Sequence, residues 1–247
     1  MTLKNIIRPF VRLLKASWVF IKSTLHLPQK YEDHFKRLSA EPQRTDIEVD
    51  GFSKLTPDQL AAVKKGVYDD VLSYAGEGKV LDFGCGTGRH LLHFPPARYQ
   101  RSGIDLNEGS LVRARAKLPG ASFFNVNLLA DHSFITASRG HYDLIYSVSV
   151  LEYFQKWELK NLFMKFFQLL KANGVVNLLF PTPQNVVDKW ATDKYRKYSV
   201  KEISGLLMSS GFTILRADQL PGVVYTGRVL ARKEKVTEPA TCESPDQ

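Results

Sequence analysis

Three glycines alternate with other residues directly after a short apolar run that ends in an acid. The stretch reads VLDFGCGTGRH, with Asp82 two residues before Gly84 and with Gly86 and Gly88 following. This pattern predicts a buried strand that turns sharply into a helix, because glycine adopts positive φ angles and lets a ligand approach the backbone. The first amides of a helix have no partner within it and point outward. We therefore interpret the stretch as a nucleotide-cofactor loop.

The spacing of this loop separates the candidate cofactors. A dinucleotide fingerprint needs a third glycine where Arg89 stands, and a P-loop needs lysine and then serine or threonine after its last glycine. The carboxylate of Asp82 disfavours a phosphate and suits an ammonium group. S-adenosylmethionine carries an ammonium, a carboxylate and a sulfonium but no phosphate. Asp105 lies 21 residues beyond Gly84, where an acid accepts hydrogen bonds from ribose hydroxyls in a β-α-β unit.

Further segments follow the loop in a characteristic order. They are Asp105, Phe123–Leu128, Tyr142–Ser147, the expected strand Gly174–Phe180 and the late segment Tyr198–Phe212. With these segments, residues 57–232 resemble the class I S-adenosylmethionine-dependent methyltransferases. The resemblance implies an α/β, Rossmann-like, doubly wound sheet of seven mostly parallel strands, with the last strand antiparallel. The late segment and Val150–Tyr153 look most similar to small-molecule enzymes, including those of quinone biosynthesis.

The resemblance also implies the location of the cofactor site. Ligands of open α/β sheets bind beyond the carboxyl ends of the strands. Asn127 stands where the family usually has an acid that contacts the adenine amino group, and a role as a loop cap explains it equally well. Cys85 is small enough for the loop and is not expected to be a nucleophile. The expected cofactor-binding residues are Asp82, Gly84, Cys85, Gly86, Gly88, Asp105, Leu106, Asn127, Leu128 and Ser147.

The residues after the fourth expected strand bear on the methyl acceptor. Nucleobase amino methyltransferases commonly have Asp/Asn-Pro-Pro-Tyr/Phe there, but this chain has Tyr146-Ser147-Val148-Ser149. The sequence does not assign a catalytic residue. Glu152 is a candidate general base, and helix capping or packing explains it equally well. No arrangement resembles a catechol-type metal site, so we expect transfer without a metal.

The chain of 247 residues divides into four expected segments. These are a basic amphipathic segment at 1–30, a connector at 31–56, the methyltransferase domain at 57–232 and a disordered tail at 233–247. Cys85 and Cys242 are the only cysteines, which gives neither a disulfide framework nor a zinc site. A reducing, cytoplasmic location is the default expectation. No apolar run reaches the roughly 18 residues of a transmembrane helix.

The net charge of +9 is concentrated near the N-terminus. Residues 1–31 contain six lysines and arginines but no acid, and the basic side chains recur at helical spacing opposite an apolar face. Basic amphipathic helices lie in the headgroup region of anionic membranes, so we predict peripheral membrane contact through residues 1–27. The alternatives are a lid on the domain, a dimer interface or a targeting segment. The oligomeric state is not predicted.

The sequence thus predicts a methyltransferase for a small-molecule, lipid-linked or glycan acceptor, with oxygen as the acceptor atom. The basic N-terminal segment and the aromatic, basic connection at 181–198 fit an amphiphilic acceptor. A protein or RNA methyltransferase is the alternative enzyme. The localised charge disfavours it, and it disfavours nucleic acid as a partner. The non-enzymatic alternative is an adaptor that binds S-adenosylmethionine but transfers nothing.

Overall fold

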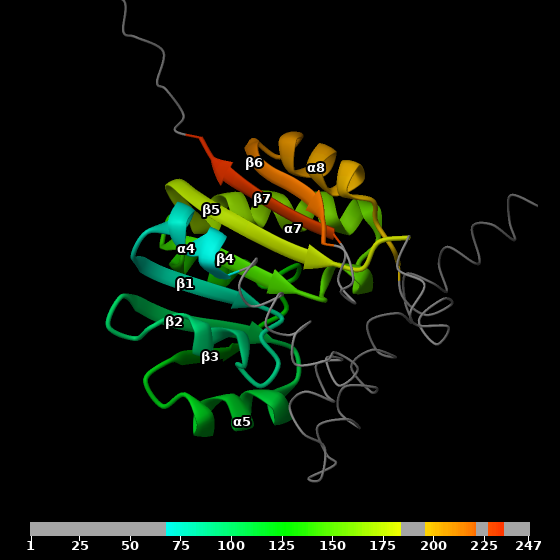
Figure 1. Ribbon diagram of the computed structural model, residues 1–247. Coiled ribbons are helices and arrows are strands. Elements are labelled where there is room, and N and C mark those ends of the chain that lie inside the picture. The colour runs from blue at the N-terminus through cyan, green and yellow to red at the C-terminus, as the bar shows by residue number, and fades with distance from the viewer. Residues whose placement is uncertain (1–67, 184–195, 221–226, 235–247) are drawn as a thin grey trace, which may run out of the picture. The chain divides into compact units, whose positions relative to one another are not determined.

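A computed structural model describes residues 68–183, 196–220 and 227–234, all of them within the unit Arg44–Gln247. In this part, seven strands form one sheet in the order β3-β2-β1-β4-β5-β7-β6 (Figure 1). Strand β7 is antiparallel to its neighbours β5 and β6, while the other pairs are parallel. The predicted Rossmann-like sheet with an antiparallel last strand is therefore confirmed. The basic segment and the connector lie outside the described residues. The tail was expected to begin at residue 233, but Lys233 is the last residue of β7, and the rest of the tail after Glu234 lies outside the described residues.

The strands are β1 (Gly78–Phe83), β2 (Tyr99–Asp105), β3 (Ser122–Asn125), β4 (Tyr142–Val148), β5 (Leu170–Phe180), β6 (Phe212–Gln219) and β7 (Gly227–Lys233). The helices are α4 (Asp70–Ala75), α5 (Glu108–Lys117), α6 (His132–Ala137), α7 (Lys156–Leu169) and α8 (Val200–Met208), with 3₁₀ turns η2 (His90–His93) and η3 (Leu151–Tyr153). No helix in the described ranges is both long enough and apolar enough to cross a membrane.

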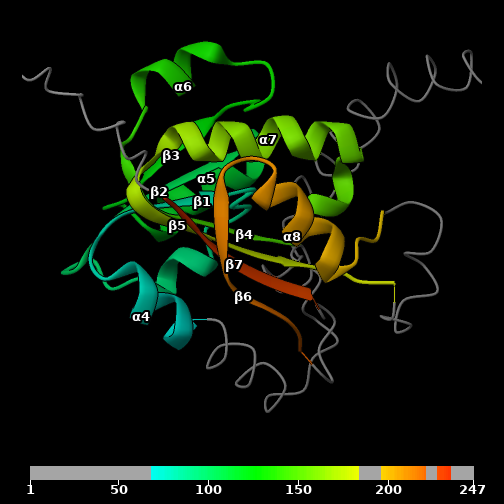
Figure 2. The same ribbon diagram turned by 90° about the horizontal axis from the view of Figure 1, so that it is seen from above.

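Apolar layers cover both faces of the sheet. Helices α6, α7 and α8 pack on one face with side chains such as Leu81, whereas α4, η2 and α5 pack on the other with side chains such as Val80. Figure 2 shows α6 and α7 on the opposite side of the sheet from α4. Parallel strands buried on both faces read as continuous apolar runs, which is why the strand at residues 79–83 could be predicted.

The segment after the glycine loop corrects one prediction. A helix was expected after Gly88, but the chain makes only the four-residue 3₁₀ turn η2. Pro95 and Pro96 follow this turn, and proline has no backbone N–H to continue a helix. The loop therefore does not lead into a long helix.

The start of β5 corrects a second prediction. The strand was expected to begin at Gly174, after Asn173, but α7 ends at Leu169 and β5 follows it directly at Leu170. Asn173 has a φ of 63° inside the strand, in the region where the pairing with β4 shifts register. Asparagine tolerates this left-handed conformation, so the pair marks an irregularity in the strand rather than a helix terminus.

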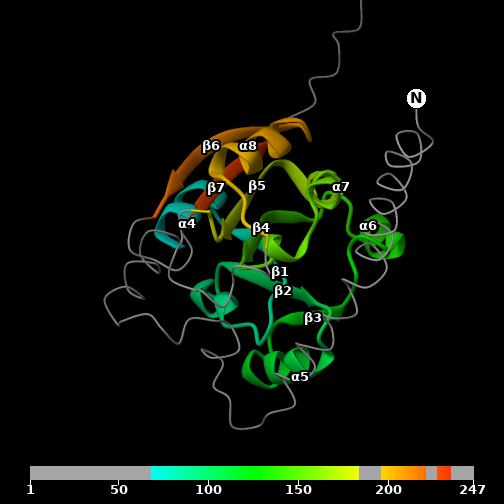
Figure 3. The same cartoon turned by 90° about the vertical axis from the view of Figure 1, so that its right-hand side faces the viewer.

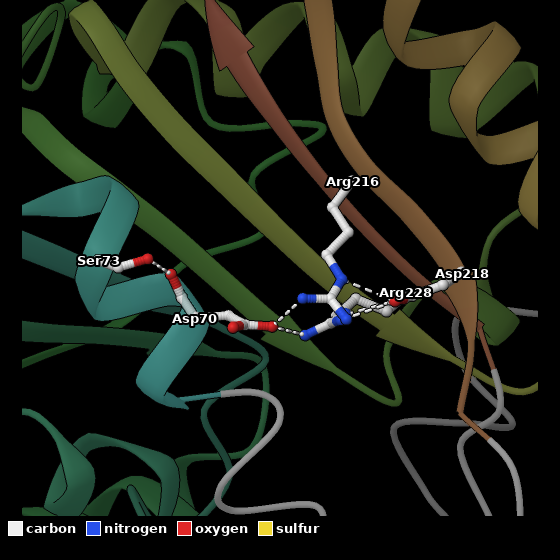
Figure 4. Close-up of polar contacts among 5 residues, drawn as sticks. All are labelled: Asp70, Ser73, Arg216, Asp218 and Arg228. Atoms are coloured by element: carbon white, nitrogen blue, oxygen red, sulfur yellow. Dashed lines mark hydrogen bonds and ion pairs between the residues drawn. The ribbon is translucent and has the colours of Figure 1, made fainter.

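A cluster of four charged side chains joins α4 to the last two strands (Figure 4). Arg228 is 1% exposed and donates to both carboxylate oxygens of Asp218 at 2.9 and 2.7 Å, and to Asp70 at 2.9 Å. Arg216 donates to the same two carboxylates. Burial opposes the charge of Arg228, but its hydrogen bonds to Asp218 and Asp70 outweigh burial and raise its pKa. We call these four residues the ion-pair cluster.

Candidate functional site

The glycine loop leaves the carboxyl end of β1 and folds against β2. Its three glycines have φ angles of 71°, 51° and 73° in chain order. The amides of Gly84 and Cys85 both donate to the carbonyl of Ile104, at 2.9 and 3.0 Å. A Cβ at Gly84 would lie 2.3 Å from a methyl group of Val150. The first position therefore needs glycine both for its conformation and for space.

Asp105, at the end of β2, holds the loop in place. Its Oδ2 accepts the N–H of Gly86 at 2.9 Å, and its Oδ1 accepts the N–H of Asn107 at 2.8 Å. Burial raises the pKa of Asp105, and these backbone hydrogen bonds oppose that rise. Each carboxylate oxygen retains a second acceptor position, and the residue is partly exposed, so Asp105 can also accept from a ribose hydroxyl. That contact stays a prediction.

Gly103 is a residue of this site that the sequence reasoning missed. A Cβ there would lie 2.7 Å from the Sγ of Cys85 and 2.9 Å from the ring of Phe123. The absent side chain lets the loop pack directly on β2, with the buried Cys85 filling the space between them. A glycine inside a strand, two residues before the acid, was the available signal of such a close backbone approach.

Asp82 lies at the end of β1 and is fully buried. It pairs in register with Tyr146 of β4. Burial is the main cause of the raised pKa of Tyr146; Tyr68 and Asp82 raise it further, and Arg89 lowers it. Asp82 is thus one member of a buried polar group beside the loop. Its contact with the ammonium group of the cofactor stays a prediction.

Three other predicted cofactor residues have different surroundings. Leu106 is half-exposed directly after the acid of β2, so its side chain is available to a flat apolar ring. Leu128 is buried in the core with α7 and α8. Ser147 is buried, and its hydroxyl donates to the carbonyl of Phe83 at 3.0 Å, which joins β4 to β1. Leu128 and Ser147 therefore have packing and strand-bridging roles whether or not they contact the cofactor.

Asn127 behaves as the loop-cap alternative describes. Its side-chain oxygen accepts the N–H of Leu129 at 3.1 Å, and its carbonyl accepts from the next turn. Asn125, at the end of β3, instead donates its side-chain amide to the carbonyl of Leu106 at 3.0 Å. Asn125 is therefore directly hydrogen-bonded to the segment after β2, a neighbour that the sequence reasoning did not identify. An adenine contact for Asn127 stays a prediction.

Glu152 follows β4 in η3 and is only 6% exposed. Its Oε2 makes no hydrogen bond in the described part of the chain. Burial raises the pKa of Glu152 to about 8, against smaller opposing effects of its own backbone amide and the nearby Ser149 hydroxyl. The capping box of α7 is formed by Gln155 and Glu158 instead. A capping role thus does not account for Glu152.

These features meet at one edge of the sheet. Figure 3 views the molecule from the side toward which β1, β4 and β5 point their carboxyl ends. The loop after β1, the acid at the end of β2 and the turn after β4 all belong to this edge. Ligands of open α/β sheets bind beyond such an edge.

Comparisons with known proteins agree with this geometry. Residues 81–176 match the family model described as a methyltransferase domain. No curated protein matches the chain. A solved S-adenosylmethionine-dependent methyltransferase from Mesorhizobium loti is 20% identical and has a TM-score of 0.58, with 70% of this chain and 99% of that chain covered.

Two further solved structures show how widely the fold is used. Magnesium protoporphyrin IX methyltransferase from Synechocystis, solved with bound S-adenosylmethionine, is 16% identical with a TM-score of 0.58, covering 87% of this chain and 96% of that one. The [4+2]-cyclase SpnF is 14% identical with a TM-score of 0.59, covering 73% and 83%.

Such identities show the fold alone, and the cyclase illustrates that this fold hosts more than one reaction. The match of residues 81–176 to the methyltransferase domain points to methyl transfer as the reaction. The strand order and the hydrogen bond between Asp105 and the glycine loop agree with this match. Residues 81–176 are therefore similar to the methyltransferase domain family, and the fold that contains them is shared with solved S-adenosylmethionine-dependent methyltransferases.

Proposed function

We propose that this protein transfers a methyl group from S-adenosylmethionine to an oxygen atom of a small-molecule, lipid-linked or glycan acceptor at a membrane surface. The observation that carries the proposal is the arrangement at the carboxyl edge of the sheet. There the glycine loop, held by Asp105, packs through Gly84 against Val150, two residues before the buried carboxyl of Glu152. The glycine loop and the turn that carries the Glu152 carboxyl are thus in contact with each other.

The residues of this edge fit S-adenosylmethionine. Gly84 and Gly86 of the loop are partly exposed, Asp105 retains acceptor positions for ribose hydroxyls, and Leu106 offers an exposed apolar surface. The cofactor supplies a methyl group already activated on a positively charged sulfur. The protein therefore has to bind both reactants, orient them and exclude water.

The choice of acceptor rests on the turn after β4. The Asp/Asn-Pro-Pro-Tyr/Phe pattern of nucleobase amino methyltransferases is replaced by a segment in which Ser147 bridges two strands and Ser149 adopts a φ of 56°. Similarity of Val150–Tyr153 to quinone-biosynthesis enzymes supports a small acceptor. The concentration of positive charge in residues 1–31 supports an acceptor presented at an anionic membrane facing the cytoplasm.

Transfer of labelled methyl groups into fractionated cell extract tests this proposal. The intact protein, S-adenosylmethionine labelled in its methyl group and extract would be incubated together, with Asp105→Ala as the control variant. We expect label in the lipid or glycan fraction and much less with the variant. Label in protein or RNA would contradict the proposed acceptor and favour the alternative enzyme. Absence of label everywhere, from protein that binds the cofactor, would contradict transfer and favour the adaptor.

Sedimentation with vesicles tests the membrane contact separately. Deletion of residues 1–27 removes five of the six basic side chains in residues 1–31. We expect the intact protein to sediment with vesicles containing phosphatidylserine at low salt, and the deleted protein to stay in solution with its affinity for S-adenosylmethionine unchanged. Failure of the intact protein to sediment would refute peripheral membrane contact while leaving the enzymatic proposal standing.

A further inference from the structure

The turn that carries Glu152 packs against the cofactor loop. Val150 would be struck by any side chain at Gly84, so its own side chain lies directly over the first position of the glycine loop. The ring of Phe83, at the end of β1, also lies 5.9 Å from the ring of Phe154, just after the turn, measured between centroids. Glu152 is therefore held in a short turn anchored on the end of β1.

The backbone of this turn is fixed from two directions. Inside it, the N–H of Tyr153 donates to the carbonyl of Val150 at 3.1 Å. From outside, the N–H of Arg196 donates to the carbonyl of Glu152 at 3.1 Å, and the hydroxyl of Tyr198 donates to the carbonyl of Phe154 at 2.7 Å. The segment that leads into α8 thus packs on the turn, and the position of Glu152 is set before any acceptor binds.

The side chain of Glu152 is buried without the usual compensation. Its Oε2 makes no hydrogen bond within the described ranges, and no charged side chain there changes its pKa. Burial is the main cause of the raised pKa of Tyr198 and of Glu152, but charged neighbours also affect the pKa of Tyr198 and none of them affects that of Glu152. Carboxylates with purely structural roles are paired when buried, and buried ones with raised pKa values are frequent at catalytic sites.

We propose that Glu152 is the general base of this enzyme and that its acceptor is an alcohol or a phenol rather than a carboxylate. An acceptor carboxylate is already ionised near neutral pH and needs no base, but a hydroxyl must lose a proton. Glu152 Oε2 takes that proton while the acceptor oxygen bonds to the methyl carbon, and the cofactor's sulfur keeps the electrons of the broken bond. This inference rests on the proposed function.

The pH dependence of transfer tests the base. Only ionised Glu152 accepts a proton, so the wild-type rate is expected to rise through about pH 8 and then level off. Glu152→Gln should lower kcat by roughly 10²- to 10⁴-fold and remove this rise, with unchanged affinity for S-adenosylmethionine. Glu158→Gln is the matched control; it keeps an acceptor oxygen for the cap of α7 and should behave like the wild type.

Thermal unfolding provides a readout that does not depend on the acceptor. The folded state favours protonated Glu152, so the stability that this provides is fully present below the ordinary pKa of 4.5 and is lost as pH rises through about 8. Glu152→Gln should therefore melt several degrees above the wild type at pH 9, with a smaller difference at pH 4.5. A difference that does not grow with pH would overturn the proposal.

The outcomes separate this inference from the proposed function. A wild-type protein that labels no fraction of cell extract counts against the proposed function. A wild type that labels its acceptor with a flat profile between pH 6 and pH 9, or a Glu152→Gln variant that labels it equally well, overturns the base while methyl transfer stands. Labelling exclusively on a carboxylate would also overturn it.

Discussion

Two regions of the molecule bury charged groups in opposite ways. In the ion-pair cluster, Arg228 is almost completely buried, and its guanidinium is hydrogen-bonded to two carboxylates. In the turn after β4, Glu152 is also buried, but its Oε2 makes no hydrogen bond within the described residues. One region neutralises its charge by pairing, whereas the other favours the protonated carboxyl.

The pH response should differ accordingly. In the cluster, burial opposes ionisation of Asp218, but the hydrogen bonds from Arg228 and Arg216 outweigh it and lower the pKa below its ordinary value of 3.8. The stability from this pairing is present above that value and is lost as pH falls through the lowered pKa. Glu152 instead makes the fold less stable as pH rises toward 8. The cluster balances its charges by ion pairs, whereas no cation in the described part of the chain affects the pKa of Glu152.

Removal of the buried cation should have the largest effect on stability. Arg228→Met removes the buried cation and leaves Arg216 as the remaining cation of the cluster beside Asp218 and Asp70, and we expect a loss of about 3 kcal/mol. The lower end of the usual range applies because those two carboxylates are 29% and 33% exposed. Urea unfolding at pH 7 measures the loss, which should shrink near pH 3 as the carboxylates become protonated.

The matched control for this variant is an exposed ion pair. Arg98→Met breaks the pair between Arg98 and Glu77, whose side chains are 48% and 67% exposed. Such pairs contribute less than about 1 kcal/mol, because solvent screens them. Equal losses for Arg98→Met and Arg228→Met would contradict the distinction between the cluster and the surface.

Asp105→Ala should weaken cofactor binding by roughly 1–3 kcal/mol, because the predicted ribose hydroxyl, the loop amide of Gly86 and the amide of Asn107 lose their acceptor. Equilibrium dialysis with labelled S-adenosylmethionine measures the change. Asp143→Ala is the control, since Asp143 also accepts a backbone N–H, from Lys79 at 2.8 Å, but lies near the amino end of β4. Unchanged affinity in Asp105→Ala would remove Asp105 from the site.

Substitution of Asn177 should have a smaller effect on stability than substitution of Arg228. It tests whether a buried polar side chain without a hydrogen-bond partner in the described residues destabilises the fold. Its side chain is fully buried in β5, and neither polar atom makes a hydrogen bond in the described part of the chain. Asn177→Leu should stabilise the protein by about 1–2 kcal/mol, because an unsatisfied amide is replaced by an apolar group of similar size. Urea unfolding measures this gain. A loss of stability would instead show that the amide has a partner in solution.

The sequence predicted features that depend on neighbouring residues. The positive φ angles of the glycine loop and the parallel strands follow from local spacing and residue type. The acid at Asp105 was predicted at the loop because β-α-β units have a narrow range of lengths.

Features that depend on distant residues could not be predicted in this way. The bond between Asp70 and Arg228 spans 158 positions, and the contact of Gly103 with Cys85 requires the folded sheet. The sequence offered Glu152 as a candidate, but its burial depends on the whole edge of the domain. The short 3₁₀ turn after Gly88, in contrast, depends on neighbouring residues. Pro95 and Pro96 directly follow it and prevent a longer helix, and both are present in the sequence.

The most direct test of the central claim is calorimetric titration of the intact protein with S-adenosylmethionine at pH 7. The carboxyl edge of the sheet presents one glycine loop with one supporting acid, so we expect saturable binding of one cofactor per chain. Absence of saturable heat, from protein shown to be folded, would contradict a cofactor site at this edge, and with it the proposed reaction.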